Sequence, residues 1–136
     1  MIDQPMNLEL VWDGGLRFTA NAGGNSTRLD GDRQAASSPM ELLLASLAGC
    51  MAIDLVHILG RMRTPPQSVR ARVEGARAES QPRRFTRIGL HFEITGACIE
   101  PASVERAIKL SRETYCSVYA SLRPDMELDI TYHLAS

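Results

Sequence analysis

The 136-residue chain lacks the patterns that mark secretion or metal binding. Its first residues, MIDQPMNLEL, contain no basic stretch followed by an apolar one, so no signal peptide is predicted and we expect a cytoplasmic protein. The three cysteines, Cys50, Cys98 and Cys116, form no CxxC motif, and no cysteine and histidine stand at a spacing typical of zinc ligands. We therefore expect no metal site.

An excess of charge of one sign is also missing. With 15 Lys and Arg against 16 Asp and Glu, the formal net charge is −1, which does not predict a nucleic-acid partner. In a reducing cytosol, a disulfide between two of these cysteines is expected to be transient and catalytic rather than structural. The length and the 44% apolar content predict one domain over residues 1–136, with a core of its own.

Turn residues and periodic apolar positions predict an α+β fold. Asp13-Gly14-Gly15 is typical of a tight hairpin turn, and a strictly alternating pattern predicts strands. The expected elements are two strands within 8–20, a short strand within 26–29, a helix over 39–63, a hairpin of strands 67–80 and 85–98, a helix over 100–116, and a strand over 126–134. This order, ββ(β)αββαβ, predicts antiparallel sheets packed on two long helices.

The beginning and end of the first helix are marked in the sequence. Ser38 followed by Glu41 three residues later is a capping box, with Pro39 at the first helical position. Pro65-Pro66 prevents the helix from continuing.

The segment Leu42–Leu59 is apolar over 18 residues, which approaches the length of a membrane span. Asp54 and His57 would be costly in hydrocarbon, and the capped ends are those of a soluble helix, so we expect no membrane partner. A helix that is apolar nearly all round must be covered on most sides. We therefore expect a homodimer, in which a second copy of the chain covers this helix.

Cys50, Asp54 and His57 lie at positions i, i+4 and i+7, so they share one helix face. Two interpretations are open: a reactive thiol, or a buried inert cysteine beside a hydrogen-bonded core histidine. Gly49 suggests a close backbone approach. Cys116 ends the second long helix and could meet Cys50 where the helices pack, whereas we interpret Cys98, at a strand end, as structural.

The stretches STRLDG, SPMELLLASLAGC and YCSV resemble the OsmC/Ohr family, the osmotically inducible and organic-hydroperoxide-resistance proteins, most closely its YhfA-like branch. The resemblance covers nearly the whole chain. It implies the OsmC-like fold, an intertwined homodimer whose active sites use both subunits, and thiol-dependent reduction of hydroperoxides.

The resemblance also implies roles for four residues. Cys50 resembles the peroxidatic cysteine, Cys116 the resolving cysteine, and Arg28 the arginine that activates the thiol. Glu41 resembles the glutamate that holds this arginine, and Arg33, in a nearby loop, is the alternative to Arg28. One departure is Ser117, which follows Cys116 where many members of the family have proline.

The expected reaction reduces alkyl or fatty-acid hydroperoxides in defence against oxidative stress. A Cys50 sulfenic acid would be resolved by Cys116, and a dithiol donor of the lipoyl or thioredoxin type would reduce the disulfide without any cofactor. The residues expected to form the substrate pocket are Leu43, Leu47, Met51, Asp54 and His57. The alternative function is a non-catalytic dimeric protein that binds a small molecule or a lipid.

Overall fold

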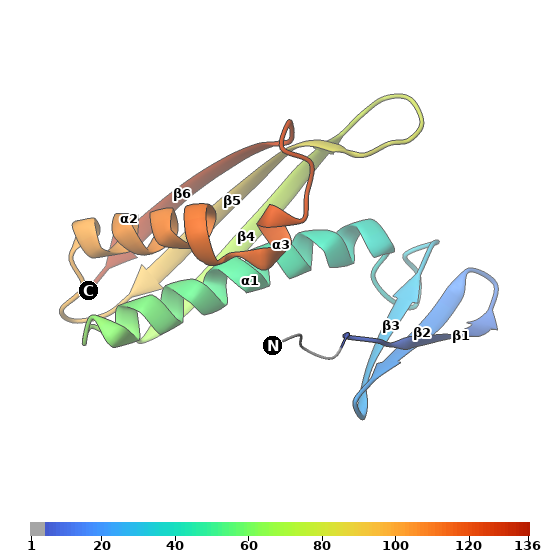
Figure 1. The fold of residues 1–136 in the computed structure, drawn as a ribbon, viewed down its shortest axis with the longest axis horizontal. Coiled ribbons are helices and arrows are strands. Elements are labelled where there is room, and N and C mark those ends of the chain that lie inside the picture. Colours follow the sequence, from blue (N-terminus) through green and yellow to red (C-terminus); the bar gives the residue numbers. More distant parts are fainter. Residues whose placement is uncertain (1–4) are drawn as a thin grey trace. The chain divides into compact units, whose positions relative to one another are not determined.

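The computed structural model describes residues 5–136, which form two compact units (Figure 1). The first unit ends at Leu43, and the second is Leu44–Ser136. The expectation that residues 1–136 form a single domain stays a prediction.

The first unit contains an antiparallel sheet of three strands in the order β1-β2-β3. Its strands are β1 (Glu9–Gly14), β2 (Arg17–Ala22) and β3 (Asn25–Asp30). Gly14 and Gly15 have φ values of 98° and 56° in the first turn, a region that glycine enters without steric cost. The predicted turn and the predicted third strand are both confirmed.

Helix α1 (Pro39–Arg61) has the predicted cap at its first turn. The backbone N–H of Glu41 donates to the Ser38 hydroxyl at 3.2 Å, and the Ser38 N–H donates to the Glu41 carboxylate at 2.9 Å. At the other end, Thr64 N–H donates to the Leu59 carbonyl and Arg63 N–H to the Gly60 carbonyl, the two bonds of a Schellman motif. Polar groups at both helix ends are therefore satisfied close to the predicted residues.

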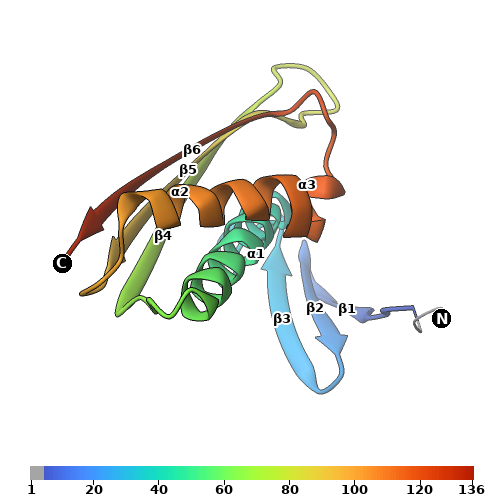
Figure 2. The same cartoon turned by 60° about the vertical axis from the view of Figure 1, so that its left-hand side comes forward.

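The second unit places two helices on one face of a three-stranded sheet, as Figures 1 and 2 show from two directions. The strands are β4 (Ser68–Arg77), β5 (Phe85–Thr95) and β6 (Glu127–Ala135), and the helices are α1 and α2 (Pro101–Leu110). β4 and β5 form the predicted antiparallel hairpin. The mixed α+β class and the element order are confirmed.

The direction of β6 differs from the prediction of antiparallel sheets. β6 pairs with β5 in parallel, with Leu90 opposite Ile130. The chain leaves β5, runs back along α2 on one face of the sheet, and so enters β6 in the same direction. Alternation of apolar residues along 126–134 is compatible with either direction, which is why the sequence pattern missed it.

The core of the second unit is formed by one face of each element. Along β5 the buried residues alternate with less buried ones, as predicted for a strand with one face on the core. The largest buried side chains are Leu47, Met51, Leu55, Leu59, Ile88, Leu90, Phe92, Ile94 and Val104.

Helix α1 is long and apolar enough to span a membrane by length and composition alone, with a mean hydropathy of 2.1 over 18 residues. The core helix of a soluble protein meets the same criteria, and one face of α1 is buried in the core of its unit. A second face is apolar but open: Ile53 is 70% exposed and Val56 is 47% exposed.

The predicted helix over 100–116 is interrupted near its end. α2 is followed by the π-helical turn η1 (Ser111–Tyr115) and the short helix α3 (Ser117–Ala120), with Cys116 between them. π-Helical turns inside helices are frequent at functional sites because they shift side chains off the regular helical spacing. Cys116 therefore does not lie on the regular continuation of α2.

Candidate active site

Cys50 and Cys116 interact through their side chains. The Cys50 side chain is among the causes that raise the pKa of Cys116, so the two side chains lie near one another. Cys50 lies on α1 and is partly exposed, whereas Cys116 is only 4% exposed. The structure therefore brings together the two cysteines that the sequence assigned to one site, and both belong to the second unit.

The surroundings of Cys116 favour the neutral thiol. Burial is the largest cause that raises the pKa of Cys116, to about 11, and the interactions with Cys50 and Asp54 act in the same direction. The backbone N–H of Tyr119 donates to the Cys116 sulfur at 3.3 Å and partly opposes this rise. At neutral pH, Cys116 is thus a thiol beside the partly exposed Cys50.

Asp54 is hydrogen-bonded to η1, the π-helical turn that precedes Cys116. The Ser111 hydroxyl donates to the Asp54 carboxylate at 2.7 Å, and Ser111 is 2% exposed. The backbone carbonyl of Ser111 accepts a hydrogen bond from Cys116 N–H at 2.8 Å. Ser111 thus connects α1, one turn after Cys50, to the backbone of Cys116.

A groove of about 680 Å³ opens between α1, α2 and η1. Asp54 and His57 line it, as do the side chains of Arg61, Arg106 and Tyr115. Since Cys50, Asp54, His57 and Arg61 lie at i, i+4, i+7 and i+11 of α1, they share one face of this helix. The groove therefore runs along the face that carries Cys50.

The apolar residues expected in the substrate pocket lie elsewhere. Leu47 is 0% exposed and Met51 is 2% exposed, so both belong to the core and do not line the groove. They fall on the buried face of α1, about 90° from the face of Cys50, because successive residues turn by about 100°. Leu43 is half-buried and belongs to the first unit. Of the five expected residues, Asp54 and His57 line the groove.

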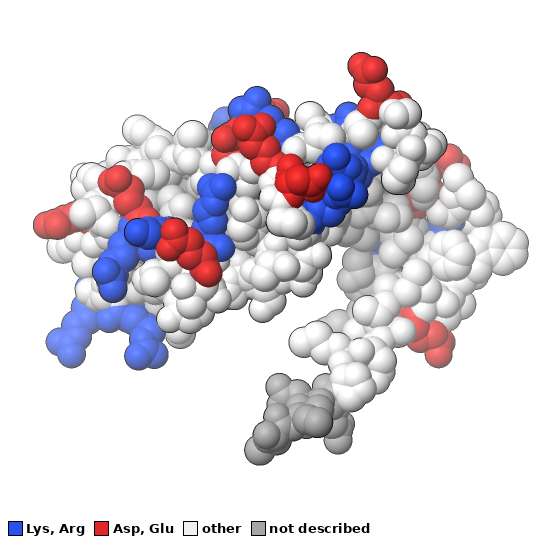
Figure 3. Space-filling view, turned by 45° about the horizontal axis from the view of Figure 1, so that its top comes forward, with Lys and Arg blue, Asp and Glu red and all other residues white. Residues whose placement is uncertain are grey.

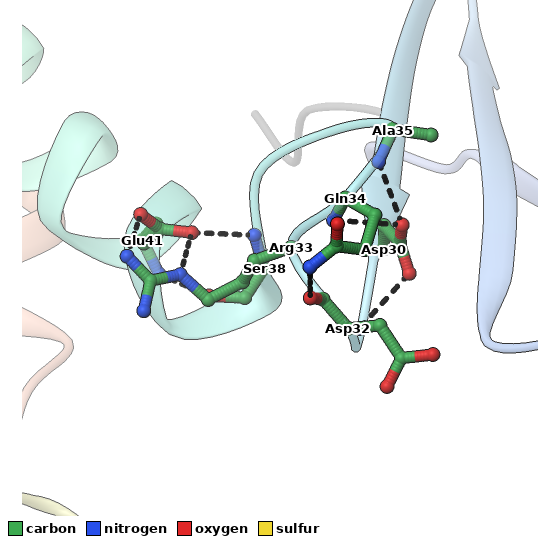
Figure 4. A network of polar contacts seen from close by, with 7 residues as sticks. All are labelled: Asp30, Asp32, Arg33, Gln34, Ala35, Ser38 and Glu41. Carbon is green, nitrogen blue, oxygen red and sulfur yellow. Dashed lines mark hydrogen bonds and ion pairs between the residues drawn. The ribbon is translucent and has the colours of Figure 1, made fainter.

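Glu41 is held by Arg33 rather than by Arg28. The Arg33 guanidinium donates two parallel hydrogen bonds of 3.0 Å to the two oxygens of the Glu41 carboxylate (Figure 4). The Ser38 N–H and Arg33 hold the pKa of Glu41 below its usual value. Arg28 lies exposed on β3, opposite Thr19. Of the two arginines considered, the structure pairs Arg33 with Glu41, because the loop after β3 carries Arg33 to this carboxylate, and the catalytic role of either arginine stays a prediction.

The loop that presents Arg33 is organised around Asp30, which is 2% exposed. Its carboxylate accepts hydrogen bonds from the backbone N–H groups of Asp32, Gln34 and Ala35, as Figure 4 shows. These bonds hold the pKa of Asp30 below its usual value. Arg33 has a φ of 58°, a left-handed conformation uncommon for a residue other than glycine, asparagine or aspartate. The Arg33–Glu41 pair belongs to the first unit.

The expected absence of a nucleic-acid partner and of a metal site stays a prediction. On the face drawn in Figure 3, basic and acidic side chains lie next to one another, and no large patch of one sign is visible. Within residues 5–136, no group of three or more His, Cys, Asp or Glu side chains could hold a metal ion. Cys98, interpreted as structural, is exposed in the turn after β5.

Sequence reasoning missed Ser111, Arg61 and Arg106. A signal for Ser111 existed, because it is a polar residue on the apolar face of the second helix, just as Asp54 is on the first. Two such residues on facing helices can satisfy one another. No comparable signal marks Arg61 and Arg106, since exposed arginines are common on helices.

Comparison with known proteins gives matches of three kinds. Residues 30–131 match the family model described as OsmC-like protein. Protein YhfA of Escherichia coli strain K12 is 37% identical over 133 residues, which cover 96% of this chain and 99% of that protein. A hypothetical protein from Aquifex aeolicus VF5 has a similar structure, with a TM-score of 0.89, 27% identity and coverage of 98% of both chains.

A more distant solved structure carries a functional name. The organic hydroperoxide resistance protein OsmC from Legionella pneumophila has a TM-score of 0.68 and 14% identity, with 97% of this chain and 98% of that chain covered. At this identity the likeness shows a shared fold.

Proposed function

Since the chain belongs to the OsmC-like protein family, we propose that it reduces organic hydroperoxides with Cys50 as the reacting thiol and Cys116 as the resolving one. The observation that carries the proposal is that the two thiols lie near one another within one unit, since the Cys50 side chain contributes to the raised pKa of Cys116. The name of the Legionella pneumophila relative, an organic hydroperoxide resistance protein, supports the class of substrate.

In the first step, the Cys50 thiolate attacks the distal oxygen of the hydroperoxide. An S–O bond forms, the O–O bond breaks, and the alkoxide that leaves takes up a proton to become an alcohol. Cys50 becomes a sulfenic acid, and the peroxide is reduced. Its partial exposure suits this role, since the peroxide must reach the sulfur from solvent.

The thiolate is the reactive form, so a positive charge is needed to favour it. The resemblance to the OsmC/Ohr family gives this role to an arginine that Glu41 holds, and Arg33 is the arginine that donates two hydrogen bonds to Glu41. A bidentate pair fixes the plane of the guanidinium, which can then present its remaining N–H groups to a thiolate or a peroxide oxygen.

In the second step, the sulfur of Cys116 attacks the sulfenic sulfur of Cys50. The S–S bond forms, the S–O bond breaks, and the hydroxide leaves as water with the proton of the Cys116 thiol. The proximity of the two side chains suits this step. An external dithiol of the lipoyl or thioredoxin type then reduces the disulfide by exchange and is itself oxidised.

The proposal includes a homodimer through the open apolar face of α1. This face comprises Gly49, Ile53, Val56 and Gly60. It lies about 90° from the face of Cys50, on the side opposite to the buried Leu47 and Met51. A Cβ added at Gly49 or Gly60 would meet no atom of residues 5–136 within 4 Å, so the close approach expected at Gly49 does not come from this part of the chain. Gly49 and Gly60, on either side of the exposed Ile53 and Val56, suit the close packing of a second copy of α1.

The experiment measures the consumption of cumene hydroperoxide, tert-butyl hydroperoxide and hydrogen peroxide with lipoyl, thioredoxin and small-thiol donors. Cys50→Ser is expected to abolish turnover, and Cys116→Ser to allow one turnover followed by over-oxidation of Cys50. Cys98→Ser is the matched control, because Cys98 is exposed and outside the thiol pair. A Cys98→Ser protein that lost activity as Cys50→Ser does would contradict the assignment.

The second candidate is a non-catalytic protein that binds a small molecule or a lipid, and the groove beside Asp54 and His57 favours it. It predicts a bound molecule in native mass spectrometry and no peroxide consumption with any donor. The peroxide panel therefore separates the two functions.

A further inference from the structure

The groove on the Cys50 face contains two arginines without a partner. Within residues 5–136, neither Arg61 nor Arg106 takes part in a side-chain hydrogen bond or an ion pair, although Arg33, Arg72, Arg84, Arg87 and Arg123 all do. Arg61 ends α1 and Arg106 lies on α2, so both helices contribute a guanidinium to the same groove.

Apart from the two arginines, Asp54 and His57, the side chains that line the groove are apolar or aromatic. Ile58, Met62, Leu110 and the ring of Tyr115 line it, and Ile58 is 9% exposed. A surface of this kind favours an alkyl chain, while the guanidinium groups favour an anionic head. The lining thus matches a ligand that has both an alkyl chain and an anionic head.

The charges along α1 predict how such a ligand is oriented in the groove. Asp54, the one acid of the lining, would repel an anionic head and already accepts the Ser111 hydroxyl. Arg61 lies two turns further along the same face, at about 10 Å from Asp54 by the rise of a helix. The anion is therefore favoured at the Arg61 end, and the alkyl chain extends toward Asp54 and Cys50.

From these observations we infer that the groove is a binding site for an amphipathic carboxylate, whose head is held by Arg61 and Arg106 and whose chain points toward Cys50. The site selects acids over their neutral analogues. The direction toward Cys50 rests on the proposed function, whereas the binding of the anion does not.

The test uses the whole reduced protein and a ligand that cannot react. Isothermal titration calorimetry compares decanoate with decanol, which has the same chain without the charge. Decanoate is expected to bind more tightly, and the double variant Arg61→Gln/Arg106→Gln is expected to lower its affinity by about tenfold or more, the usual effect of losing hydrogen bonds to a charged group.

The matched control is the double variant Arg70→Gln/Lys109→Gln. It removes the same charge from exposed positions outside the groove and is expected to keep the affinity for decanoate. Equal binding of decanoate and decanol, or equal weakening in both double variants, would overturn the inference. Failure of the proposed function looks different, because decanoate would still bind while no hydroperoxide was consumed.

Discussion

Ser111 donates a 2.7 Å hydrogen bond to the carboxylate of Asp54 and, through its backbone carbonyl, accepts one from Cys116. The residue thus joins the helix that carries Cys50 to the turn that positions Cys116. A hydrogen bond to a charged acceptor in a partly buried contact is stronger than an average one. We regard Ser111 as a positioning residue for the resolving cysteine.

Ser111→Ala is expected to slow the formation of the Cys50–Cys116 disulfide. The first step, formation of the sulfenic acid, does not involve Cys116 and should keep its rate. The measurement is single-turnover mass spectrometry after one equivalent of cumene hydroperoxide, with sulfenic acid, disulfide and sulfinic acid followed in time.

Loss of this bond should also lower the free energy of unfolding by about 1–3 kcal/mol. Ser111→Thr is the control, because it restores the hydroxyl and should recover the disulfide rate. An unchanged disulfide rate in Ser111→Ala would show that the bond has no positioning role.

The raised pKa of Cys116 predicts a pH dependence of the second step. Because the folded protein holds this pKa near 11, above its ordinary 9.0, the attacking thiolate is scarce at neutral pH. The disulfide rate should therefore increase as the pH rises from 7 to 9, while the Cys50→Ser protein forms no disulfide at any pH. A rate that stays level over this range would contradict the assigned environment of Cys116.

The same shift has a consequence for stability. The folded state favours the neutral thiol, so the environment of Cys116 contributes to the free energy of unfolding. This contribution is fully present below the unfolded pKa of about 9 and is lost as the pH rises toward about 11. Chemical denaturation at pH 8 and at pH 10.5 measures the free energy of unfolding. Between these two pH values, this free energy should fall more for the wild type than for Cys116→Ser.

Arg33→Gln is expected to lower the rate of sulfenic acid formation more than Arg28→Gln does. Arg33 is the residue bound to Glu41, and an amide cannot replace a charged bidentate donor. The measurement is the second-order rate of cumene hydroperoxide reduction by each reduced variant. Arg28→Gln serves as the control of equal charge, and a larger effect of Arg28→Gln would reverse the assignment.

Ile53→Glu is expected to prevent dimer formation. Ile53 is 70% exposed in the single chain, and a carboxylate at the centre of an apolar interface would be buried without a partner. Light scattering after size-exclusion chromatography measures the mass, with Lys109→Glu as a control on the surface of α2. A wild-type monomer, or an Ile53→Glu dimer, would exclude this face as the interface.

Much of the fold followed from local patterns. The capping box of Ser38 and Glu41, the alternation along β5, and the glycines of the first turn each depend on neighbours in the sequence, so they could be predicted. Cys50 and Cys116 could be paired because each lies on one of the long helical segments. The approach of two such segments depends little on loop detail.

The features that were missed depend on contacts between distant segments. Arg33 reaches Glu41 because Asp30 gathers three backbone N–H groups and turns the loop, a conformation that no periodic pattern encodes. The parallel direction of β6 depends on the path of the chain after β5. Leu47 and Met51 were assigned to a pocket because their apolar character fits a core and a pocket equally well.

Peroxide consumption by the wild type and by Cys50→Ser tests the central claim most directly, with Cys98→Ser as the matched cysteine control. We predict that the wild type and Cys98→Ser consume cumene hydroperoxide with a dithiol donor, and that Cys50→Ser does not. Consumption by Cys50→Ser at the wild-type rate would contradict the claim that Cys50 carries the reaction.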